Sequence, residues 1–588
     1  MTIFILFLLI IFGMGWTSIL FPKNSLGLQF AISALLLFLW ICVGGVVLGF
    51  LQMLTPIYVI LWIAVFLGCS LFSINKHPLK TRNIPDFYTL DTAILSIATI
   101  LYLILACPPI WYRDSLTYHA TLPKLWAQNG GYQATDQILF EFFPSLWQWG
   151  LSFLYVFGEA PLFHPRYLGV FLTMMTALIL REIISFHNHS KIHQSIGILC
   201  YVLIPTVLEF GTSIYVMPWL SFLCISSVFF HLHTSQQENE SLISKRANFI
   251  LEIVTGAAII SSKYSGLIWI FCLVLLKKKQ HIRYLFGVGI LGSFFYIRNF
   301  ILHKNPFFPK FSDLFGYGFW GEWRSDAYEY TLQDYGYGRD LLNFLALPFR
   351  MFTTIDMQYG FQGSLGPTIG ILFVVSLYYY RDIRIFVICW FVIWALQVQQ
   401  IRFLIPMISI VIAYGITKIP PKYVWIPALL SLSWSVIPIQ KLWERQQGLQ
   451  YWTMHKTDND FLERQIPQNY PIDRFLNNQG TVKKVWYVWM RGYVYYLDKD
   501  VRLDSVFGAW RFEELLDISE TSEDIQQYFY QQNISHIAIN HSFFLVDNNA
   551  DLYDGRTQKL QQKFHEILEK KIFVPIFDQN HVVVYEIQ

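Results

Sequence analysis

Long runs of apolar residues, separated by short polar loops, occupy the chain from its first residue to about residue 440. Many of these runs approach the roughly 20 residues that an α-helix needs to cross a bilayer. Residues 441–588 have the mixed pattern of a water-soluble protein. The sequence therefore predicts a large all-α membrane domain followed by a C-terminal soluble domain.

The lengths of the apolar runs predict about 14 membrane spans. One further apolar stretch, residues 142–160, would reverse the side of every later loop if it crossed the membrane, so we expect a re-entrant or surface-lying helix there. The predicted spans lie near residues 2–22, 27–50, 54–75, 89–107, 166–186, 195–214, 216–233, 249–262, 264–277, 283–301, 366–380, 385–400, 403–418 and 423–440.

Basic residues orient these spans, because Lys and Arg concentrate in cytoplasmic loops. The loop that contains Asp114, the long segment 302–365 and everything after residue 440 then face the outside. The basic residues in alternate short loops are Lys76, Lys80, Arg82, Lys191, Lys245, Arg246, Lys277, Lys278, Lys279, Arg283, Arg381, Arg384, Lys418 and Lys422.

The composition supports a membrane protein and excludes several other classes. Hydrophobic residues make up 54% of the chain and charged residues 14%, against roughly 25% charged in soluble domains. A net charge of +3 is too small to indicate a nucleic-acid partner. All seven cysteines lie in apolar stretches, so the sequence has neither a disulfide framework nor a zinc pattern.

The C-terminal segment alternates strand-like runs, such as "KKVWYVWM", "ISHIAIN" and "FVPIFDQNHVVVYEI", with helical runs. A capping sequence at Thr521 begins one helix, and Asp578 to Asn580 form the predicted turn of a hairpin. These elements predict a small α/β sandwich. It has no Gly-rich phosphate loop and no nucleophile elbow, so we expect it to support acceptor binding or docking, with catalysis in the membrane domain.

The stretch "IWYRDSLTYHATLPKLWAQNGGY", residues 110–132, is the first candidate site. Its apolar positions recur every three or four residues, which predicts an amphipathic interfacial helix ended by Gly130 and Gly131. Asp114 lies just past the end of a span, where an ionisable side chain is a functional candidate. The alternative is that Asp114 pairs with Arg113 or caps the helix.

Other polar groups fall on the same predicted outer side. Lys263 lies in a break between two short spans, Arg298 and Asn299 lie near the end of another, and Arg402 follows a third. Singly, each fits a side chain that reaches toward the interface. Together they suit an anionic substrate such as a lipid phosphate. His303 and Glu209 belong to the same set of outward-facing groups.

Four motifs in a fixed order, "DSLTYH", "SKYSGL", "RNFILHKNPFFP" and "QQIRFLIP", resemble bacterial GT-C glycosyltransferases related to protein O-mannosyltransferases and aminoarabinose transferases. The resemblance covers about residues 89–420, with loops 108–165 and 302–365, and leaves residues 1–88 as extra N-terminal helices. Asp114 stands alone where many members have an Asp-Glu or Asp-Asp pair.

The resemblance implies transfer of a sugar from a polyprenyl-phosphate donor to a glycan, lipid or protein acceptor, on the periplasmic side of the bacterial cytoplasmic membrane. Asp114 would act as general base with inversion at the anomeric carbon, and Lys263, Arg298 and Arg402 would stabilise the leaving phosphate. A divalent cation, Mg²⁺ or Mn²⁺, is a candidate cofactor with no identifiable ligands. Further substrate-binding candidates are Arg113, Tyr118, His119, Glu209, Asn299 and His303, and Glu209 is the second candidate base.

Two other functions remain open at this point. A transporter or flippase of lipid-linked saccharides would also have many spans and outer cations, but the sequence has no evident internal repeat. An O-antigen ligase or polymerase would rely on arginines and a histidine without an essential outer aspartate. The aromatic-rich loop 302–365 suits either a sugar-binding lid or an interfacial anchor.

Overall fold

The structure is a computed structural model, and it describes residues 10, 13, 14, 17, 25–76, 89–134, 137–158, 161–162, 164–236, 242–277, 281–318, 321–333, 335–355, 360–503, 511–545 and 557–588. The chain divides into two compact units. The membrane unit comprises residues 1–108, 125–132 and 142–452, and the C-terminal unit comprises residues 109–124, 133–141 and 453–588. The predicted span 2–22 lies almost entirely outside the described residues.

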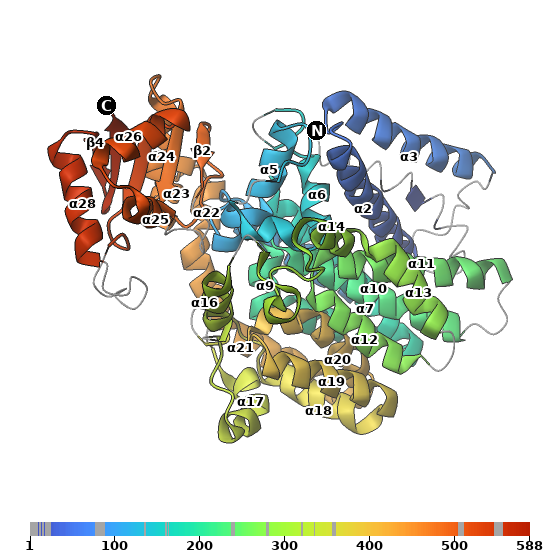
Figure 1. The fold of residues 1–588 in the computed structure, drawn as a ribbon. Helices are drawn as coiled ribbons and strands as arrows, with labels where there is room; N and C mark the ends of the chain where they lie inside the picture. Colours follow the sequence, from blue (N-terminus) through green and yellow to red (C-terminus); the bar gives the residue numbers. More distant parts are fainter. Residues whose placement is uncertain are drawn as a thin grey trace. The chain divides into compact units, whose positions relative to one another are not determined.

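The membrane unit is built from helices (Figure 1). Four are long and apolar enough to cross a membrane, or six if each of two bent pairs counts as one span, among the residues described. The protein is therefore a multi-pass membrane protein, and the count of about 14 spans stays a prediction. The helices that match predicted spans are α2 (Leu26–Phe50), α3 (Pro56–Lys76), α4 (Leu90–Ala106), α7 (Arg166–His187), α10 (Val216–Gln236), α11 (Leu242–Ser262), α12 (Ser265–Leu276), α18 (Pro367–Tyr379), α19 (Arg381–Leu396), α20 (Ile405–Ile416) and α21 (Trp425–Gln446).

Two predicted spans, 195–214 and 283–301, are bent helix pairs. The first consists of α8 (Lys191–Val202) and α9 (Pro205–Gly211), which meet at 69°. Pro205 at the start of α9 has no N–H to continue the hydrogen bonds of α8, which explains the break. The second consists of α13 (His281–Gly292) and α14 (Phe294–His303), which meet at 56°. Broken helices of this type line cavities in membrane proteins.

The segment 142–160 forms the short helix α6 (Leu146–Ser152) inside the membrane unit. All seven of its residues are buried, so a helix lying on the surface is the wrong interpretation. Gly45 and Gly49 of α2 let the two helices approach, because a Cβ at either position would clash with Trp149. A helix this short does not cross a bilayer, which is consistent with the re-entrant interpretation.

The described part of the long segment 302–365 includes the helices α15 (Ser312–Phe315), α16 (Glu322–Gln333) and α17 (Leu341–Thr353). Leu341, Leu342, Leu345 and Phe349 of α17 are all strongly exposed. They recur at helical spacing and form one apolar face, as in helices that lie in the membrane interface. The interfacial interpretation of this part of the segment therefore has a structural basis.

The C-terminal unit contains a five-stranded sheet in the order β2-β1-β3-β5-β4 (Figure 1). Strand β1 pairs in parallel with β2 and β3, whereas β5 pairs antiparallel with β3 and β4. The strands are β1 (Lys484–Val488), β2 (Asp500–Arg502), β3 (His536–Asn540), β4 (Phe573–Gln579) and β5 (Val582–Ile587), and the helices are α23 (Asp458–Gln465), α24 (Tyr470–Asn478), α25 (Arg511–Ile518), α26 (Ser522–Gln531) and α28 (Thr557–Glu569).

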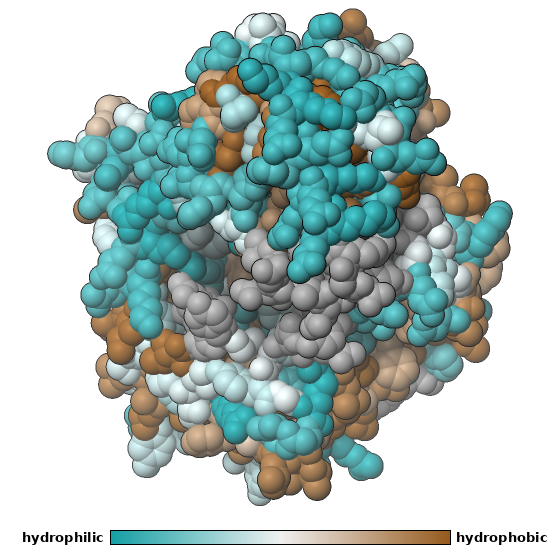
Figure 2. All heavy atoms as spheres, turned by 60° about the vertical axis from the view of Figure 1, so that its left-hand side comes forward, coloured by the Kyte–Doolittle hydropathy of each residue, from teal (hydrophilic) through white to brown (hydrophobic). Residues whose placement is uncertain are grey.

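Helices cover both faces of this sheet, so the predicted α/β sandwich is confirmed. Trp486 and Val488 of β1 point into a hydrophobic cluster with α25, α26 and α28. Tyr487, between them, points to the other face and donates a hydrogen bond of 2.5 Å to Asp473 of α24. The predicted hairpin is present, with its turn at Asn580 and His581, both at positive φ. Hydrophilic side chains cover most of the face of this unit that is turned to the viewer in Figure 2.

Candidate functional site

The break between α11 and α12 presents Lys263 inside the membrane unit. Its ammonium lies 4.1 Å from the centre of the Phe403 ring and 3.9 Å from the sulfur of Met217. Ser262 ends one helix and Ser265 begins the next, so Lys263 lies where regular helical structure is interrupted. A charged side chain at such a break is a typical feature of membrane binding sites.

Arg402 lies on a short 3₁₀ turn, Ile401–Leu404, that joins α19 to α20. Its guanidinium lies 5.7 Å from the ring of Phe210, 5.4 Å from that of Tyr215 and 5.2 Å from that of Phe403. Its Nε donates a hydrogen bond of 3.0 Å to Gln400. We call Lys263, Arg402, Phe403, Phe210 and Tyr215 the Phe403 cluster. The structure thus brings two of the predicted cations together, around one shared ring.

Glu209 on α9 neighbours this cluster in sequence but already has a partner. Its carboxylate forms an ion pair with Arg445 of α21, and only 5% of the residue is exposed. The role of Glu209 as the second candidate base stays a prediction, and Arg445 is a cation that the sequence reasoning missed.

Arg298 and Asn299 on α14 take part in a buried hydrogen-bond network. The amide of Asn299 donates to the carbonyl of Phe142 at 2.7 Å and to the hydroxyl of Tyr264 at 3.0 Å, and accepts from Arg298 at 2.8 Å. Tyr264 in turn donates to the carbonyl of Phe308 at 2.8 Å. Because Tyr264 directly follows Lys263, this network fixes the helix break that carries the cation.

His303 ends α14 and packs between aromatic rings. Its imidazole stacks on Phe308 at 4.3 Å and meets Phe142 edge to face at 4.4 Å. These are the same segments that Asn299 holds by hydrogen bonds. His303 therefore belongs structurally to the network around Asn299.

Asp114 belongs to the C-terminal unit, at the start of a π-helical turn, Ser115–His119, that leads into α5 (Thr121–Gln128). A helical segment is therefore present as predicted, and α5 ends at Gln128, two residues before Gly130, whose φ is +68°. The Asp114 side chain makes no capping hydrogen bond to the turn, so helix capping is not its role. Single π-helical turns occur frequently at functional sites.

Several polar groups surround Asp114 within the C-terminal unit. Burial raises the pKa of Tyr493, and the charges of Arg113, Arg491 and Asp114 all act on that hydroxyl. These four side chains are therefore near neighbours. Arg491 adopts a left-handed conformation, with φ at +59°, just after strand β1, and ligands of sheets with parallel strands often bind beyond the strand ends.

Tyr118 and His119 lie on the same turn but differ in their surroundings. The Tyr118 ring stacks on Phe140 at 4.5 Å and is half-buried, whereas His119 is 1% exposed. The apolar positions Leu116 and Leu122 are also buried. Protein rather than lipid therefore covers the apolar face of this segment.

Long-range contacts attach the Asp114 segment to the rest of the C-terminal unit. Lys124 donates to the carbonyl of Tyr495 at 2.8 Å and pairs with Asp498 at 3.2 Å. The hydroxyl of Tyr496 donates to the carbonyl of Ile110 at 2.7 Å. The sequence reasoning missed these residues, because their partners lie more than 370 positions away along the chain.

A buried arginine, Arg166, was also missed. It is 1% exposed and donates to the carbonyls of Thr212, Pro108 and Leu105 and to the side chain of Gln446, at 2.7 to 2.9 Å. It thus ties the ends of α4, α9 and α21 together at the point where the chain leaves α4 toward Asp114. In the sequence, its place at the start of an apolar run was the feature that could have indicated a buried role.

No metal site is evident in the described part of the chain. Nowhere among those residues do three His, Cys, Asp or Glu side chains gather closely enough to hold a metal ion. The carboxylates of Asp114 and Glu209 lie in different compact units. Within the described ranges the carboxylates and imidazoles do not assemble a cation site, and the divalent cation stays a prediction from the sequence.

Comparison with solved structures identifies the fold. The crystal structure of ArnT from Cupriavidus metallidurans bound to undecaprenyl phosphate matches with a TM-score of 0.53 and 12% sequence identity. The match covers 84% of this chain and 97% of ArnT. The chain has the ArnT fold. The apo structure of ArnT matches similarly, with a TM-score of 0.52 and 11% identity.

The likeness to ArnT shows a shared fold, which agrees with the fold that the resemblance of the four motifs implies. It extends beyond the motifs, since it includes most of the chain. No family profile matches the sequence, and a search of curated proteins finds no significant relative.

Proposed function

We propose that this protein is a membrane glycosyltransferase that moves a sugar from a polyprenyl-phosphate donor to an acceptor. The observation that carries the proposal is the Phe403 cluster, two cations on one aromatic ring at a helix break, within a fold shared with ArnT. ArnT has been solved with undecaprenyl phosphate bound. The cluster offers the chemistry that such a phosphate requires.

Lys263 and Arg402 would bind the donor phosphate and stabilise its charge as it leaves. Cleavage of the bond between sugar and phosphate passes through an oxocarbenium-like state, in which negative charge accumulates on the phosphate. Preorganised cations lower the energy of that state most when they are shielded from water. The half-buried positions of both side chains and the aromatic rings around them provide that shielding.

Asp114 would act as the general base. Its carboxylate would take the proton of the acceptor hydroxyl while that oxygen attacks the anomeric carbon on the face opposite the phosphate, which gives inversion. Its half-buried position beside Arg113, Arg491 and Tyr493 supports this role. No step in this scheme uses a metal ion.

The groups near Asp114 would bind the acceptor, whether glycan, lipid or protein. Arg113 is exposed and Tyr118 is half-buried, so both can contact an acceptor. His119 and Tyr493 are buried and would position the turn. Arg491 would add a cation at the end of β1.

Arg298, Asn299 and His303 would act through the break that they fix rather than by touching the substrate. Asn299 and His303 contact Tyr264 and the segments around Phe142 and Phe308. Arg298 donates to Asn299. We therefore expect their loss to displace Lys263. This proposal revises their expected role as direct substrate ligands.

In this proposal the protein lies in a bacterial cytoplasmic membrane with its C-terminal unit on the periplasmic side. Purified full-length protein in nanodiscs tests the activity. Radiolabelled polyprenyl-phosphate sugar should lose its label to an acceptor, with release of polyprenyl phosphate. A flippase would move the donor across vesicles without consuming it, and a ligase would retain activity when Asp114 is replaced by Asn.

A further inference from the structure

A second site lies elsewhere in the membrane unit, in a cavity of about 680 Å³ that shares no residue with the Phe403 cluster. We propose that this cavity binds the headgroup of an anionic membrane phospholipid. Much of its lining comes from helix ends: His187 ends α7, Leu276 ends α12, Tyr379 ends α18 and Arg381 begins α19. The cavity therefore lies at the level where helices leave the membrane, and its volume is typical of ligand pockets.

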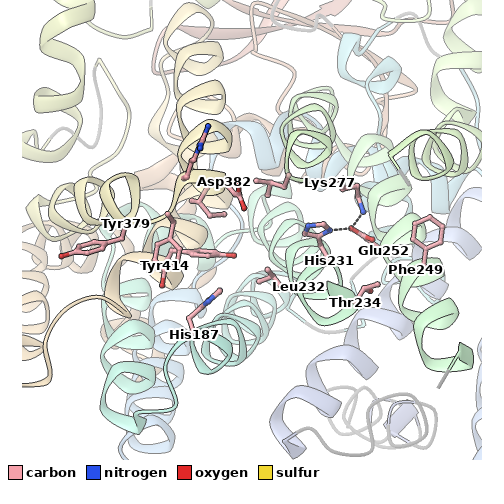
Figure 3. Close-up of a pocket in the computed structure, with 14 residues that line it drawn as sticks. His187, His231, Leu232, Thr234, Phe249, Glu252, Lys277, Tyr379, Asp382 and Tyr414 are labelled. Carbon is pink, nitrogen blue, oxygen red and sulfur yellow. Dashed lines mark ion pairs between the residues drawn. The ribbon is translucent and has the colours of Figure 1, made fainter. Parts of the chain in front are cut away.

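The buried carboxylate in this cavity is already neutralised. Glu252 accepts an ion pair from Lys277 at 2.6 Å and lies 3.4 Å from His231 (Figure 3). The side chains of Glu252 and Lys277 are both nearly fully buried. A carboxylate matched in this way attracts no further cation.

The remaining charges favour an anion. Arg381 lines the cavity and is exposed, and the ammonium of Lys418 lies 5.1 Å from the ring of Tyr380 in its wall. Among the described residues of the lining, Asp382 is the one carboxylate beside Glu252. The Nε2 atom of His187 is buried and has no hydrogen-bond partner among the described residues. Arg381 and a polar ring nitrogen in the lining, with Lys418 beside the wall, therefore outweigh one carboxylate, which suits a singly charged phosphodiester.

The rest of the lining suits a lipid. Leu232, Phe249 and Ile383 form apolar wall, and Tyr379 and Tyr414 are tyrosines of the kind found at membrane interfaces. Figure 3 shows Tyr379, Tyr414 and His187 apart from the group of Lys277, Glu252 and His231. The basic loops around residues 277, 381 and 418 are those that the sequence predicts to be cytoplasmic. Basic pockets between membrane helices on that side bind anionic lipid headgroups.

Native mass spectrometry of the full-length protein tests this proposal without reference to glycosyl transfer. The protein is reconstituted with equal amounts of phosphatidylcholine and phosphatidylglycerol, extracted in mild detergent, and the retained lipids are counted. Wild type should retain phosphatidylglycerol preferentially. Arg381→Ala should reduce that retention by about fivefold, in keeping with the effect of one basic residue near anionic lipid, and His187→Gln should reduce it further.

Arg384→Ala is the matched control. Arg384 lies one turn further along α19 and is also exposed, but it donates to the carbonyls of Leu377 and Tyr378 and does not line the cavity. Its loss should leave lipid retention unchanged. Equal losses of lipid retention in both variants would show that only the general surface charge attracts the lipid. That outcome, or no preference for phosphatidylglycerol in the wild type, would overturn the proposal. Displacement of the lipid by inorganic phosphate would assign the cavity to a soluble anion instead.

Discussion

The ammonium of Lys263 lies 4.1 Å from the ring of Phe403, the residue that directly follows Arg402 in the chain. The guanidinium of Arg402 lies 5.2 Å from the same ring. Contacts between a cation and an aromatic ring are favourable in themselves. Two of them around one ring place positive charge where the proposed function requires it, beside the phosphate of the donor.

Replacement of either cation should weaken donor binding. A charge-assisted hydrogen bond contributes roughly 1.5 to 3 kcal/mol, so Lys263→Ala and Arg402→Ala should each raise the Kd for the polyprenyl-phosphate donor by about 10- to 150-fold. Lys263→Arg keeps the charge and should restore part of the affinity. The measurement is donor binding to purified protein by scintillation proximity.

Lys422→Ala is a suitable control for that experiment, since its ammonium lies over Tyr423 in the loop before α21, outside the Phe403 cluster. It should leave the Kd unchanged. Wild-type affinity in both Lys263→Ala and Arg402→Ala would show that the phosphate binds elsewhere.

The attachment of the Asp114 segment to the C-terminal unit should matter for catalysis. Tyr496→Phe removes the hydrogen bond to the carbonyl of Ile110 and should cost about 1 kcal/mol, which corresponds to a several-fold loss in kcat if the segment loses its position. The KM for the donor should stay the same, because the Phe403 cluster is untouched. A parallel rise in KM would instead indicate general damage to the protein.

A buried acid makes the stability of the C-terminal unit depend on pH. Burial raises the pKa of Asp473 well above its usual value, although the hydrogen bond from Tyr487 and the charge of Lys124 lower it. A raised pKa means that the folded state binds the proton more tightly, so the stabilisation is full below the ordinary pKa and is lost as pH rises through the raised value. Asp473→Asn should therefore stabilise the protein more at pH 8 than at pH 5.

Hydrogen exchange of β1 and β3 in the full-length protein measures that effect, after correction for the intrinsic exchange rates. Asp524→Asn provides a control whose expected effect on stability has the opposite sign. Hydrogen bonds from Thr521 lower the pKa of Asp524, so this substitution should destabilise the unit near neutral pH and lose its effect in acid. A stabilisation by Asp473→Asn that does not vary with pH would contradict the assignment.

Much of the fold was predictable from the sequence because its signals are local. The apolar runs locate most of the helices, and alternation with capping residues locates β1, β3, α26 and the final hairpin. The bends within α8–α9 and α13–α14 were not predicted. Apolar content is the same on both sides of a bend, so hydropathy does not reveal it.

The candidate site was predictable in its residue types but not in its groupings. Lys263 and Arg402 were each found as a cation at a helix end, yet their common partner Phe403 is an ordinary apolar residue in sequence. Asn299 was expected to bind substrate, and the structure shows that it bonds to Tyr264 and Phe142. Such roles depend on tertiary contacts between distant segments, which one sequence does not display.

Cysteine accessibility tests the predicted orientation. Tyr530 lies in the C-terminal unit and Arg246 lies in a loop predicted to be cytoplasmic, and both are exposed. In intact spheroplasts an impermeant thiol reagent should label Tyr530→Cys and leave Arg246→Cys unlabelled. Labelling of Arg246→Cys alone would show that the topology is the reverse of the predicted one and that the proposed side of catalysis is wrong.

The most direct test of the proposed mechanism is the rate of sugar transfer by the Asp114→Asn variant, measured with purified full-length protein alongside donor binding. Asn keeps the shape of Asp and removes its basicity, so transfer should fall by about 100-fold or more while the Kd for the donor stays near that of wild type. Asp517→Asn, which changes a carboxylate paired with Lys559 elsewhere in the C-terminal unit, should transfer normally. An Asp114→Asn variant that transfers sugar as fast as wild type would show that Asp114 is not the base and contradict the mechanism.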